Sequence, residues 1–384
     1  MISISPRVQA LIPRLGQPLE RLAKEKGATR IVMLASNENP LGPSPKAIEA
    51  VRKYADQGHR YVDPTSAEMT AVLATKFNKK PFQIICGGGT DLLLAYIINA
   101  FSEEGEEILT SDGSFSGFYA NAKKFGRQLK LTPLKNYAFD LEAIAANICD
   151  QTKIIYLANP NNPTGTIFTK KEFENFMSRV PASILVILDE AYFEYACWNP
   201  DYPDGMQYDY ENLLVTRTFS KCYGLAGMRI GYAAGPEYLI KELYKIRLPY
   251  EPNCLALKAA IAALEDQKFI KQSIIANRQS LDLMKSKFDQ LGIKWVETFA
   301  NFLLLVFPSE KSAHEFFEGC LEKGVLVRHV KGYGIPEGVR INSGTPQETR
   351  YALEVMEQVY SKTRTESMDV SQTSLKAFQK AATP

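Results

Sequence analysis

The sequence predicts an α/β protein, in which a mainly parallel sheet is covered by helices and is followed by a smaller α+β region. Between residues 82 and 234, short apolar runs alternate with stretches of helical periodicity, and several runs are rich in Ile and Val. This alternation is typical of strands joined by helical crossovers. The runs are continuously apolar, as expected for strands that are covered on both faces.

The elements before the sheet are predicted from caps and periodicity. Residues 19–28 form a short amphipathic helix that ends at Gly27. The Pro, Gly and Asn residues that follow indicate an ordered loop, in which Ser44 is the N-cap and Pro45 the first residue of the next helix. Residues 65–78 carry apolar side chains at helical spacing, which predicts a further helix.

Apolar runs are predicted to form the strands of the large sheet. They span residues 82–86, 106–110, 153–158, 184–189, 213–217 and 229–234. A glycine-rich turn at 87–90 separates the first of them from a helix that begins at Thr90 or Asp91. Helical stretches separate most of the others, which completes the α/β pattern.

Beyond about residue 255 the pattern becomes that of an α+β region. Helices are expected over 255–290 and near 311–323, and strands at 302–307, 325–330 and 339–342. We therefore expect a large domain over 46–255, and a small domain formed by 1–45, an N-terminal arm included, together with 256–360. The polar, Ser/Thr-rich residues 361–384 are expected to form a loosely held tail.

The composition excludes several classes of protein. The 45 Lys and Arg residues nearly balance the 43 Asp and Glu residues, so the net charge of +2 gives no reason to expect a nucleic-acid partner. Hydrophobic residues make up 45%, which is enough for a folded core. No apolar run is long enough for a membrane span, and Arg7 and Arg14 make the N-terminus a poor signal peptide.

Cysteine and histidine are sparse. The 6 cysteines are scattered without a CxxC pair, and only 3 histidines are present, so no metal site is expected. The histidines are also too dispersed to indicate a Ser-His-Asp site. We interpret the cysteines as reduced core thiols of a cytoplasmic protein.

Two motifs indicate anion binding and a functional carboxylate. CGGGTDLLL places glycines between a strand and a helix N-terminus, where backbone N–H groups can hold a phosphate, although a tight turn is the simpler interpretation. Asp189 ends the very apolar run ILVILD, at the sheet edge that faces the ligand crevice in open α/β sheets. As a plain alternative, Asp189 is a helix N-cap. Tyr192 follows three positions later and could reach the same space.

A lysine supplies a candidate nucleophile. Lys221 follows a strand, lies close to Thr218 and Ser220, and precedes Arg229 in a hydrophobic, glycine-rich stretch. Desolvation there would lower its pKa and make the amine reactive toward an aldehyde, whereas most lysines are simply solvated. Asn162 in NPNNPTG and Arg340 in VRINSGT offer an amide and a carboxylate-binding or phosphate-binding group. A cofactor with a phosphate, a pyridine nitrogen and an aldehyde would use the whole set, and pyridoxal phosphate is that cofactor.

From about residue 7 to 360 the sequence resembles the fold-type-I, aspartate-aminotransferase-like family, and within it the histidinol-phosphate aminotransferase branch. The stretches that carry the resemblance are ASNENPLGPSPKAIEA, ANPNNPTG, LDEAY, FSKCYGLAGMRIGY and GVLVRHVKGYGIPEGVRINSGT. The resemblance implies a pyridoxal 5'-phosphate-dependent transferase with a mainly parallel seven-stranded sheet in its large domain. It also implies a homodimer.

The resemblance also implies roles for individual residues. Lys221 forms a Schiff base with the cofactor and moves the substrate proton, while Asp189 pairs with the pyridine N–H. Asn162 and Tyr192 hydrogen-bond the cofactor's 3-oxygen, and Phe115 stacks on its ring. The phosphate group is held by Gly89, Thr90, Asp91, Thr218, Ser220 and Arg229, and by Tyr61 of the partner subunit. Arg340 grips the acidic group of the substrate with help from Arg328, and Asn39, Arg14 and Asp112 are further candidates for substrate contacts.

Some stretches depart from the pattern of the branch and leave the reaction open. SDGSF, PRLGQP, Leu92 and YVDPTSAEM replace residues that the branch usually carries, which puts histidinol phosphate in doubt as the substrate but not the cofactor. Amino transfer to a 2-oxo acid is the first hypothesis. Oxygen-dependent oxidation or desaturation of an amino acid such as arginine, for which Asp112 could hold the guanidinium, and decarboxylation are alternatives; for Asp112 an ordinary turn residue is the simpler interpretation. A regulatory cofactor-binding protein is disfavoured because no basic DNA-binding module precedes the family-like region.

Overall fold

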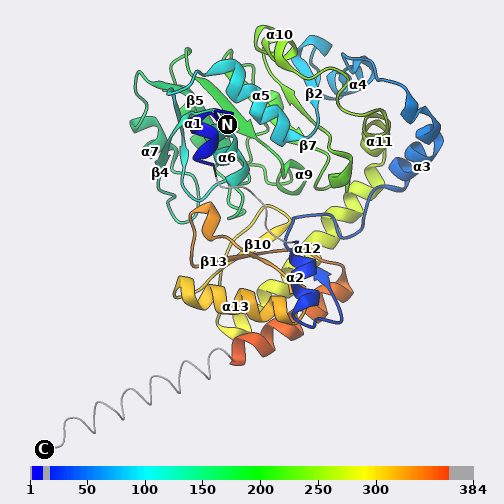
Figure 1. Cartoon of the computed structure of the whole chain (residues 1–384), viewed down its shortest axis with the longest axis vertical. Helices are drawn as coiled ribbons and strands as arrows, with labels where there is room; N and C mark the ends of the chain where they lie inside the picture. Colours follow the sequence, from blue (N-terminus) through cyan, green and yellow to red (C-terminus); the bar gives the residue numbers. More distant parts are fainter. Residues whose placement is uncertain (1, 12–17, 363–384) are drawn as a thin grey trace, which may run out of the picture.

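The computed structural model describes residues 2–11 and 18–362, which form a larger and a smaller region (Figure 1). The larger region is built on a seven-stranded sheet in the order β2-β8-β7-β6-β5-β3-β4. All neighbouring strands are parallel except for β8, which runs antiparallel to β2 and β7. The strands are β2 (Ile84–Gly87), β3 (Glu107–Ser111), β4 (Gln128–Thr132), β5 (Thr152–Ala158), β6 (Leu185–Asp189), β7 (Leu213–Thr218) and β8 (Gly231–Ala234).

Helices cover the large sheet and bury its apolar strands. They are α3 (Pro45–Tyr54), α4 (Ala67–Phe77), α5 (Thr90–Phe101), α6 (Ser116–Lys124), α7 (Leu141–Ala146), α8 (Lys170–Met177), α9 (Phe193–Ala196), α10 (Glu237–Ile246) and α11 (Cys254–Glu265). Short 3-10 helices lie at η1 (Ala55–His59), η2 (Pro81–Gln83), η3 (Gly205–Gln207) and η4 (Ala226–Met228). The strands β2, β6 and β7 are buried along their whole length, as their continuous apolar sequences predict.

The smaller region contains a four-stranded antiparallel sheet in the order β12-β13-β10-β9. Its strands are β9 (Lys294–Val296), β10 (Phe302–Val306), β12 (Arg328–His329) and β13 (Gly338–Asn342), while β1 (Val32–Met33) and β11 (Val325–Leu326) pair separately in parallel. Its helical parts are α2 (Leu19–Glu25), α12 (Gln267–Leu291), α13 (Glu310–Glu322), η5 (Lys331–Tyr333) and residues 346–362. A separate core fills it, with Phe288, Leu303 and Phe316 at its centre.

The fold expected from the sequence is confirmed, with local corrections. The helix expected over 255–290 is two helices, because Asp266 ends α11 and accepts a hydrogen bond from Phe269 N at the start of α12. The strand expected over 325–330 is divided between β11 and β12, which pair with different partners. In chain order, the first and last strands of the large sheet, β2 and β8, begin two residues later than expected. The 3-10 helix η2 precedes β2, and Arg229 adopts a left-handed conformation before β8.

The remaining expectations concern the N-terminal arm, the domain division, the tail, the cysteines and membrane spans. The helix α1 (Pro6–Gln9) lies against α6 of the larger region, whereas α2 packs on α13, so the N-terminal arm touches both regions (Figure 1). The division into domains at 46–255 stays a prediction, and the tail beyond 362 lies outside the described residues.

All cysteines are free, but Cys149 and Cys197 are exposed and Cys254 is half-buried, so the expectation of core thiols is wrong for these three. Across the described part of the chain, no helix combines the length and apolar character needed to cross a membrane.

Candidate active site

A cavity of about 380 Å³ lies at the carboxyl ends of β5, β6 and β7, facing β12 and β13 of the smaller sheet. Ligand crevices form at this edge in open α/β sheets. The structure brings most of the candidate residues together in it: Thr90, Asp91, Phe115, Asn162, Asp189, Tyr192, Thr218, Ser220, Lys221, Arg229, Arg328 and Arg340.

Lys221 supplies an amine that faces the cavity from the loop after β7. Its Nζ donates to the carbonyl oxygen of Ser36 at 3.3 Å. Burial lowers the pKa of Lys221 to about 8, and the positive charges of Arg340 and Arg229 act in the same direction. A substantial neutral fraction is therefore present near physiological pH, and a neutral amine is the form that attacks an aldehyde. Its place in the cavity wall argues against the interpretation as a solvated surface lysine.

Asp189 offers a carboxylate in the same cavity. It is 5% exposed, and it accepts hydrogen bonds from Tyr156 Oη at 2.8 Å and from Thr216 Oγ1 at 3.1 Å. Burial raises the pKa of Asp189 to about 6, and these two hydrogen bonds limit the rise. The N-cap alternative is wrong, because α9 begins at Phe193 with Tyr192 in the N-cap position. Asp189 is therefore a largely ionised carboxylate at pH 7.5, available to a cationic N–H.

The opposite end of the cavity is suited to an anion. The N-terminus of α5 points into it at Thr90 and Asp91, beside the hydroxyl groups of Thr218 and Ser220. Gly89 has φ +92°, and a Cβ there would lie 2.7 Å from Arg229 Nη2. Only glycine therefore lets the guanidinium approach this turn. Arg229 Nη1 donates to the carbonyl oxygen of Ala226 at 2.9 Å, which fixes the side chain.

An amide and a phenol are held between the amine and the smaller sheet. Arg340 Nη1 donates to Asn162 Oδ1 at 2.5 Å, and its Nη2 donates to the carbonyl oxygen of Ala35 at 2.8 Å. Asn37 Nδ2 donates to Tyr192 Oη at 2.8 Å. Because the phenol oxygen accepts this bond, its own proton is left to donate into the cavity.

Two arginines from the smaller sheet close the cavity. Arg328 on β12 and Arg340 on β13 are directly paired across the two strands. Burial lowers the pKa of Arg328, and the positive charge of Arg340 lowers it further. Arg340 is 3% exposed, and its buried Nε has no hydrogen-bond partner. Two adjacent cations with an unpaired donor favour an anionic ligand.

Tyr333 also lines the cavity, and the guanidinium of Arg340 lies 5.6 Å from the centroid of its ring. Burial raises its pKa, but the charge of Arg340, a hydrogen bond with Ser116 and the charge of Arg328 outweigh burial, so its pKa is lowered overall.

Some candidates lie elsewhere. Asn39 is buried and donates to the carbonyl oxygen of Cys222 and to Ser273 Oγ, both at 2.8 Å. Asp112 accepts from Gly113 N at 2.9 Å, as a turn residue does, and does not line the cavity. Tyr61 is 82% exposed and stacks on Tyr250 outside the cavity. Arg14 lies outside the described residues.

Sequence reasoning missed several residues of the cavity wall: Ser36, Asn37, Glu38, Tyr156 and Tyr333. Tyr156 sits inside an apolar strand, where an aromatic residue is normally a core residue. Tyr156 lies two positions before Ala158, the last residue of the strand, so both side chains lie on the same face of the sheet. This spacing could have predicted that Tyr156 faces the cavity. Asn37 follows a strand of only two residues, which leaves almost no periodic signal.

Taken together, the groups present fit pyridoxal 5'-phosphate. The amine of Lys221 matches its aldehyde, the carboxylate of Asp189 matches its pyridine nitrogen, and the turn at Gly89 with Arg229 matches its phosphate. Among the described residues, no group of His, Cys, Asp and Glu is arranged to hold a metal ion.

Comparison with known proteins agrees with this geometry. Residues 29–356 match the family model of class I and II aminotransferases. The chain is 38% identical over 362 residues to histidinol-phosphate aminotransferase 2 of Pseudomonas fluorescens strain Pf0-1, covering 93% of this chain and 97% of that protein. It is 39% identical over 346 residues to histidinol-phosphate aminotransferase of Brevibacillus brevis, covering 90% and 94%.

A solved structure shows the same architecture. Histidinol-phosphate aminotransferase from Sinorhizobium meliloti, in complex with pyridoxal 5'-phosphate, superimposes with a TM-score of 0.88 at 28% identity, covering 94% of this chain and 98% of that one. The chain therefore belongs to the class I and II aminotransferase family and is a pyridoxal 5'-phosphate-dependent aminotransferase of fold type I.

Proposed function

We propose that this aminotransferase moves the amino group of histidinol phosphate to a 2-oxo acid. The observation that carries the choice of substrate is the pair of cavity-facing arginines, Arg328 and Arg340, opposite the amine of Lys221. Two guanidinium groups suit a phosphate with two negative charges, and they also suit the carboxylate of a 2-oxo acid in the other half of the reaction. The relatives with 38% and 39% identity carry the same activity in their names.

The cavity residues divide the chemistry among them. When bound, pyridoxal 5'-phosphate supplies an aldehyde that captures amines and a ring that withdraws electrons. Asp189 would pair its carboxylate with the protonated ring nitrogen, and Tyr192 and Asn162 would donate hydrogen bonds to the cofactor. Lys221 Nζ takes and returns the proton on the substrate carbon that bears the amino group. Phe115, which lines the cavity, would stack on the ring and exclude water.

The phosphate of the cofactor is assigned to the anion-binding end of the cavity. Thr90 and Asp91, in the first turn of α5, line this end with backbone N–H groups that have no partner within the helix. The hydroxyl groups of Thr218 and Ser220 and the guanidinium of Arg229 complete the cradle. This part of the proposal predicts that inorganic phosphate competes with the cofactor for the empty protein.

A direct assay tests the substrate. Purified protein loaded with cofactor is incubated with histidinol phosphate and 2-oxoglutarate, and glutamate is measured. We expect glutamate to form, and to form far more slowly with histidinol, which lacks the phosphate. Replacing Arg328 with Met should reduce the difference in rate between histidinol phosphate and histidinol. Equal rates with both amines would contradict the proposed use of the arginine pair.

The same protein incubated with arginine and oxygen tests the alternative reaction. Oxygen consumption without glutamate formation would favour an oxidase. The reported relatives are aminotransferases, which favours amino transfer, and Asp112 lies outside the cavity wall where it would have to meet a guanidinium. A Lys221→Ala variant should lose the chromophore that borohydride reduces, whichever reaction occurs.

We also propose that the chain acts as a homodimer in the cytoplasm. The exposed Tyr61 stacks on the exposed Tyr250, which lies two residues after the exposed Leu248. This supports the first part, since exposed aromatic clusters are enriched at interfaces. Tyr61 of the partner subunit would then reach the phosphate. Sedimentation should give twice the mass of the 43.0 kDa chain, and Tyr61→Phe should weaken cofactor binding without changing that mass.

A further inference from the structure

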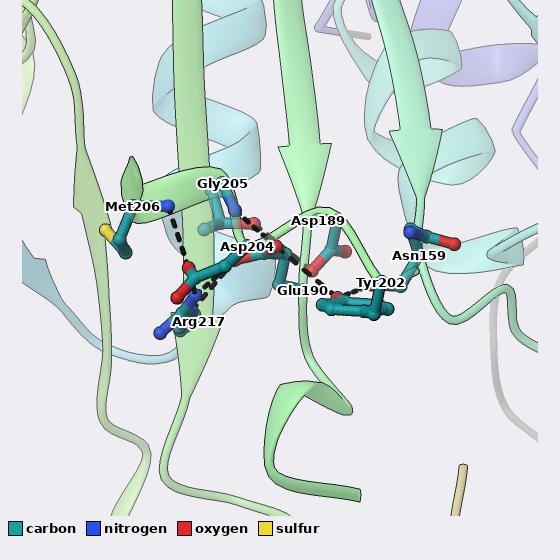
Figure 2. Close-up of polar contacts among 9 residues, drawn as sticks. Asn159, Asp189, Glu190, Tyr202, Asp204, Gly205, Met206 and Arg217 are labelled. Atoms are coloured by element: carbon teal, nitrogen blue, oxygen red, sulfur yellow. Dashed lines mark hydrogen bonds and ion pairs between the residues drawn. The ribbon is translucent and has the colours of Figure 1, made fainter. Parts of the chain in front are cut away.

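A charge cluster of Glu190, Arg217 and Asp204 lies near the carboxyl ends of β6 and β7, outside the cavity wall (Figure 2). Successive residues of a strand point to opposite faces, so Asp189 and Thr218 face the cavity while their neighbours Glu190 and Arg217 face away from it. The side chains of Glu190 and Arg217 are 0% and 1% exposed. Nothing in the proposed chemistry uses either of them.

The two side chains are fully engaged with each other and with a surface loop. Arg217 Nε donates to Glu190 Oε2 at 2.8 Å, and Arg217 Nη2 forms an ion pair with the same oxygen at 2.7 Å. Its Nη2 also contacts Asp204 Oδ1 at 2.5 Å, and its guanidinium lies over the ring of Phe193 at 3.3 Å. The other carboxylate oxygen of Glu190 accepts from Gly205 N at 2.8 Å. Every part of the cluster is thus held in one position.

The cluster reaches the ends of three neighbouring strands. Glu190 follows β6, and Arg217 is the penultimate residue of β7. Tyr202 Oη contacts Glu190 Oε1 at 3.4 Å and donates to the carbonyl oxygen of Asn159, just after β5. Asn159 N in turn donates to the carbonyl oxygen of Asp189 at 2.9 Å. These are the strand ends that carry Asn162, Asp189 and Thr218 into the cavity.

Stability alone is a weak reason for such a cluster. Burying an ion pair costs several kcal/mol per ion in desolvation, and apolar residues of similar volume often stabilise a fold as well or better. Its bonds are instead directional, and they converge on backbone that carries cavity side chains. A cofactor held by several side chains binds well only if their spacing is preset.

We propose that Glu190 and Arg217 are positioning residues, which fix the ends of β5, β6 and β7 so that the side chains on the cavity face are preset for the cofactor. The proposal rests on the proposed roles of Asp189, Asn162 and Thr218. It does not depend on which amine is the substrate. Failure of the histidinol phosphate assay would therefore leave it standing.

A variant in which both residues are replaced by neutral ones of similar volume distinguishes a role in positioning the cavity residues from a role in stabilising the fold. The variant Glu190→Gln/Arg217→Met keeps an acceptor for Gly205 N and an apolar group beneath Phe193, and it removes both buried charges together. The control is Arg127→Met, which removes a buried arginine that hydrogen-bonds to Ser102 in the same region but does not line the cavity. Tyr202→Phe, which removes only the hydroxyl between Glu190 and Asn159, serves if the double variant does not fold.

Two readouts are measured besides melting temperature. The first is the dissociation constant of pyridoxal 5'-phosphate for the empty protein. The second is hydrogen exchange of the empty protein in peptides over 158–162, 189–191 and 216–220. We expect the double variant to bind the cofactor at least tenfold more weakly and to exchange at least tenfold faster in these peptides, and Tyr202→Phe to weaken binding about fivefold, which corresponds to one hydrogen bond.

The control should lower the melting temperature and leave both readouts unchanged. Cofactor affinity and exchange at wild-type levels in the folded double variant would overturn the proposal. If only Tyr202→Phe folds, unchanged affinity and exchange in that variant would overturn it equally. A wild-type protein that does not bind the cofactor would instead refute the proposed function.

Discussion

At the scale of single residues, Lys221 shows how burial prepares a reactive group. Burial lowers its pKa to about 8, and the nearby cations of Arg340 and Arg229 contribute in the same direction. An ordinary lysine stays charged up to about pH 10.4 and would be largely unreactive at neutral pH. We therefore expect the rate at which the empty protein captures pyridoxal 5'-phosphate to rise with pH and to reach half its maximum near pH 8.

Stopped-flow absorbance measures this rate, and Lys221→Ala, which should show no covalent capture, is the control. A rate that keeps rising to pH 10 would mean that Lys221 is not desolvated. The Arg340→Met variant refines the test, since removing one cation should move the midpoint upward by less than the shift that burial causes.

Asn37 is a second residue whose role follows from one bond. Its amide donates to Tyr192 Oη, while its backbone N donates to Asn342 Oδ1 at 3.0 Å and its carbonyl accepts from Asn301 Nδ2 at 3.1 Å. Asn37 therefore links the smaller sheet to the phenol in the cavity. Its φ of +57° suits glycine, so Asn37→Gly removes the amide without backbone strain. We expect kcat to fall about fivefold to tenfold, the effect of about one hydrogen bond.

A double-mutant cycle with Tyr192→Phe checks this interpretation. If Asn37 acts through the phenol, the double variant should be no slower than Tyr192→Phe alone. Effects that simply multiply would show that Asn37 acts on something other than Tyr192.

The sequence predicted the cavity residues that end strands or start helices, and it missed those whose position depends on tertiary packing. Asp189 and Lys221 follow apolar strands, so strand topology alone brings them to one edge. Asn37 comes from a loop and Tyr333 from the short η5 of the smaller region, and no local pattern indicates that these segments fold over the larger sheet. For the same reason neither Asn39 nor Asp112, which are close in sequence to cavity residues, lines the cavity: Asn39 donates to Cys222 and Ser273, and Asp112 bonds within its own turn.

At the scale of elements, the largest disagreement with the sequence is a helix boundary with a specific cause. Asp266 accepts from Phe269 N at 3.3 Å and caps α12, and its other oxygen accepts from Ser44 Oγ at 2.7 Å. Ser44 in turn accepts from Ala47 N at 3.3 Å and caps α3. Two helix starts far apart in the chain thus share one pair of caps. Periodicity over 255–290 continues across the boundary, so only the cap reveals it.

The edge strand β4 was missed for a different reason. Its residues QLKLT are largely solvent-facing, so its apolar run is too short to stand out. The other six strands of the large sheet were all predicted, because burial on both faces imposes a continuous apolar sequence.

The shared caps lead to a prediction about stability and pH. Ser44→Ala should lower the free energy of unfolding by about 1–2 kcal/mol at pH 7, because it removes one cap and leaves Asp266 without a buried partner. Burial raises the pKa of Asp266, but the bond from Ser44 and the backbone N–H of Phe269 lower it overall. A lowered pKa means that this stabilisation is present above about pH 4 and is lost as pH falls through the folded value.

Urea unfolding at pH 7 and at pH 3 measures the effect, which should shrink at the lower pH. Ser309→Ala is the matched control, since Ser309 caps the exposed start of α13 with Ser312 and no carboxylate. Its effect should be independent of pH. An equal loss at both pH values in Ser44→Ala would mean that the bond to Asp266 contributes nothing.

At the scale of the whole molecule, the active site opposes the stability of the fold around it. Burial raises the pKa of Asp189 to about 6, well above the value of about 3.9 for an unfolded aspartate. The folded protein therefore holds a proton between about pH 4 and 6 that the unfolded chain has released. The contribution of Asp189 to stability is present below about pH 4 and is lost as pH rises through 6.

This loss should be visible when Asp189 is compared with its neutral isostere. In the empty protein, Asp189→Asn should gain stability relative to wild type as pH rises from 4 to 8, by about 2–3 kcal/mol for a shift of about two pKa units. With pyridoxal 5'-phosphate bound, the order should reverse at pH 8, because the ionised carboxylate then has a cationic N–H as its partner whereas asparagine does not. Urea unfolding with and without cofactor at both pH values gives the comparison.

If Asp189→Asn shows no gain in stability over the wild type without cofactor, then water or a rearranged neighbour already compensates the buried charge. If Asp189→Asn is more stable than the wild type both without and with cofactor, then Asp189 does not face the ring nitrogen, and the proposed orientation of the cofactor is wrong.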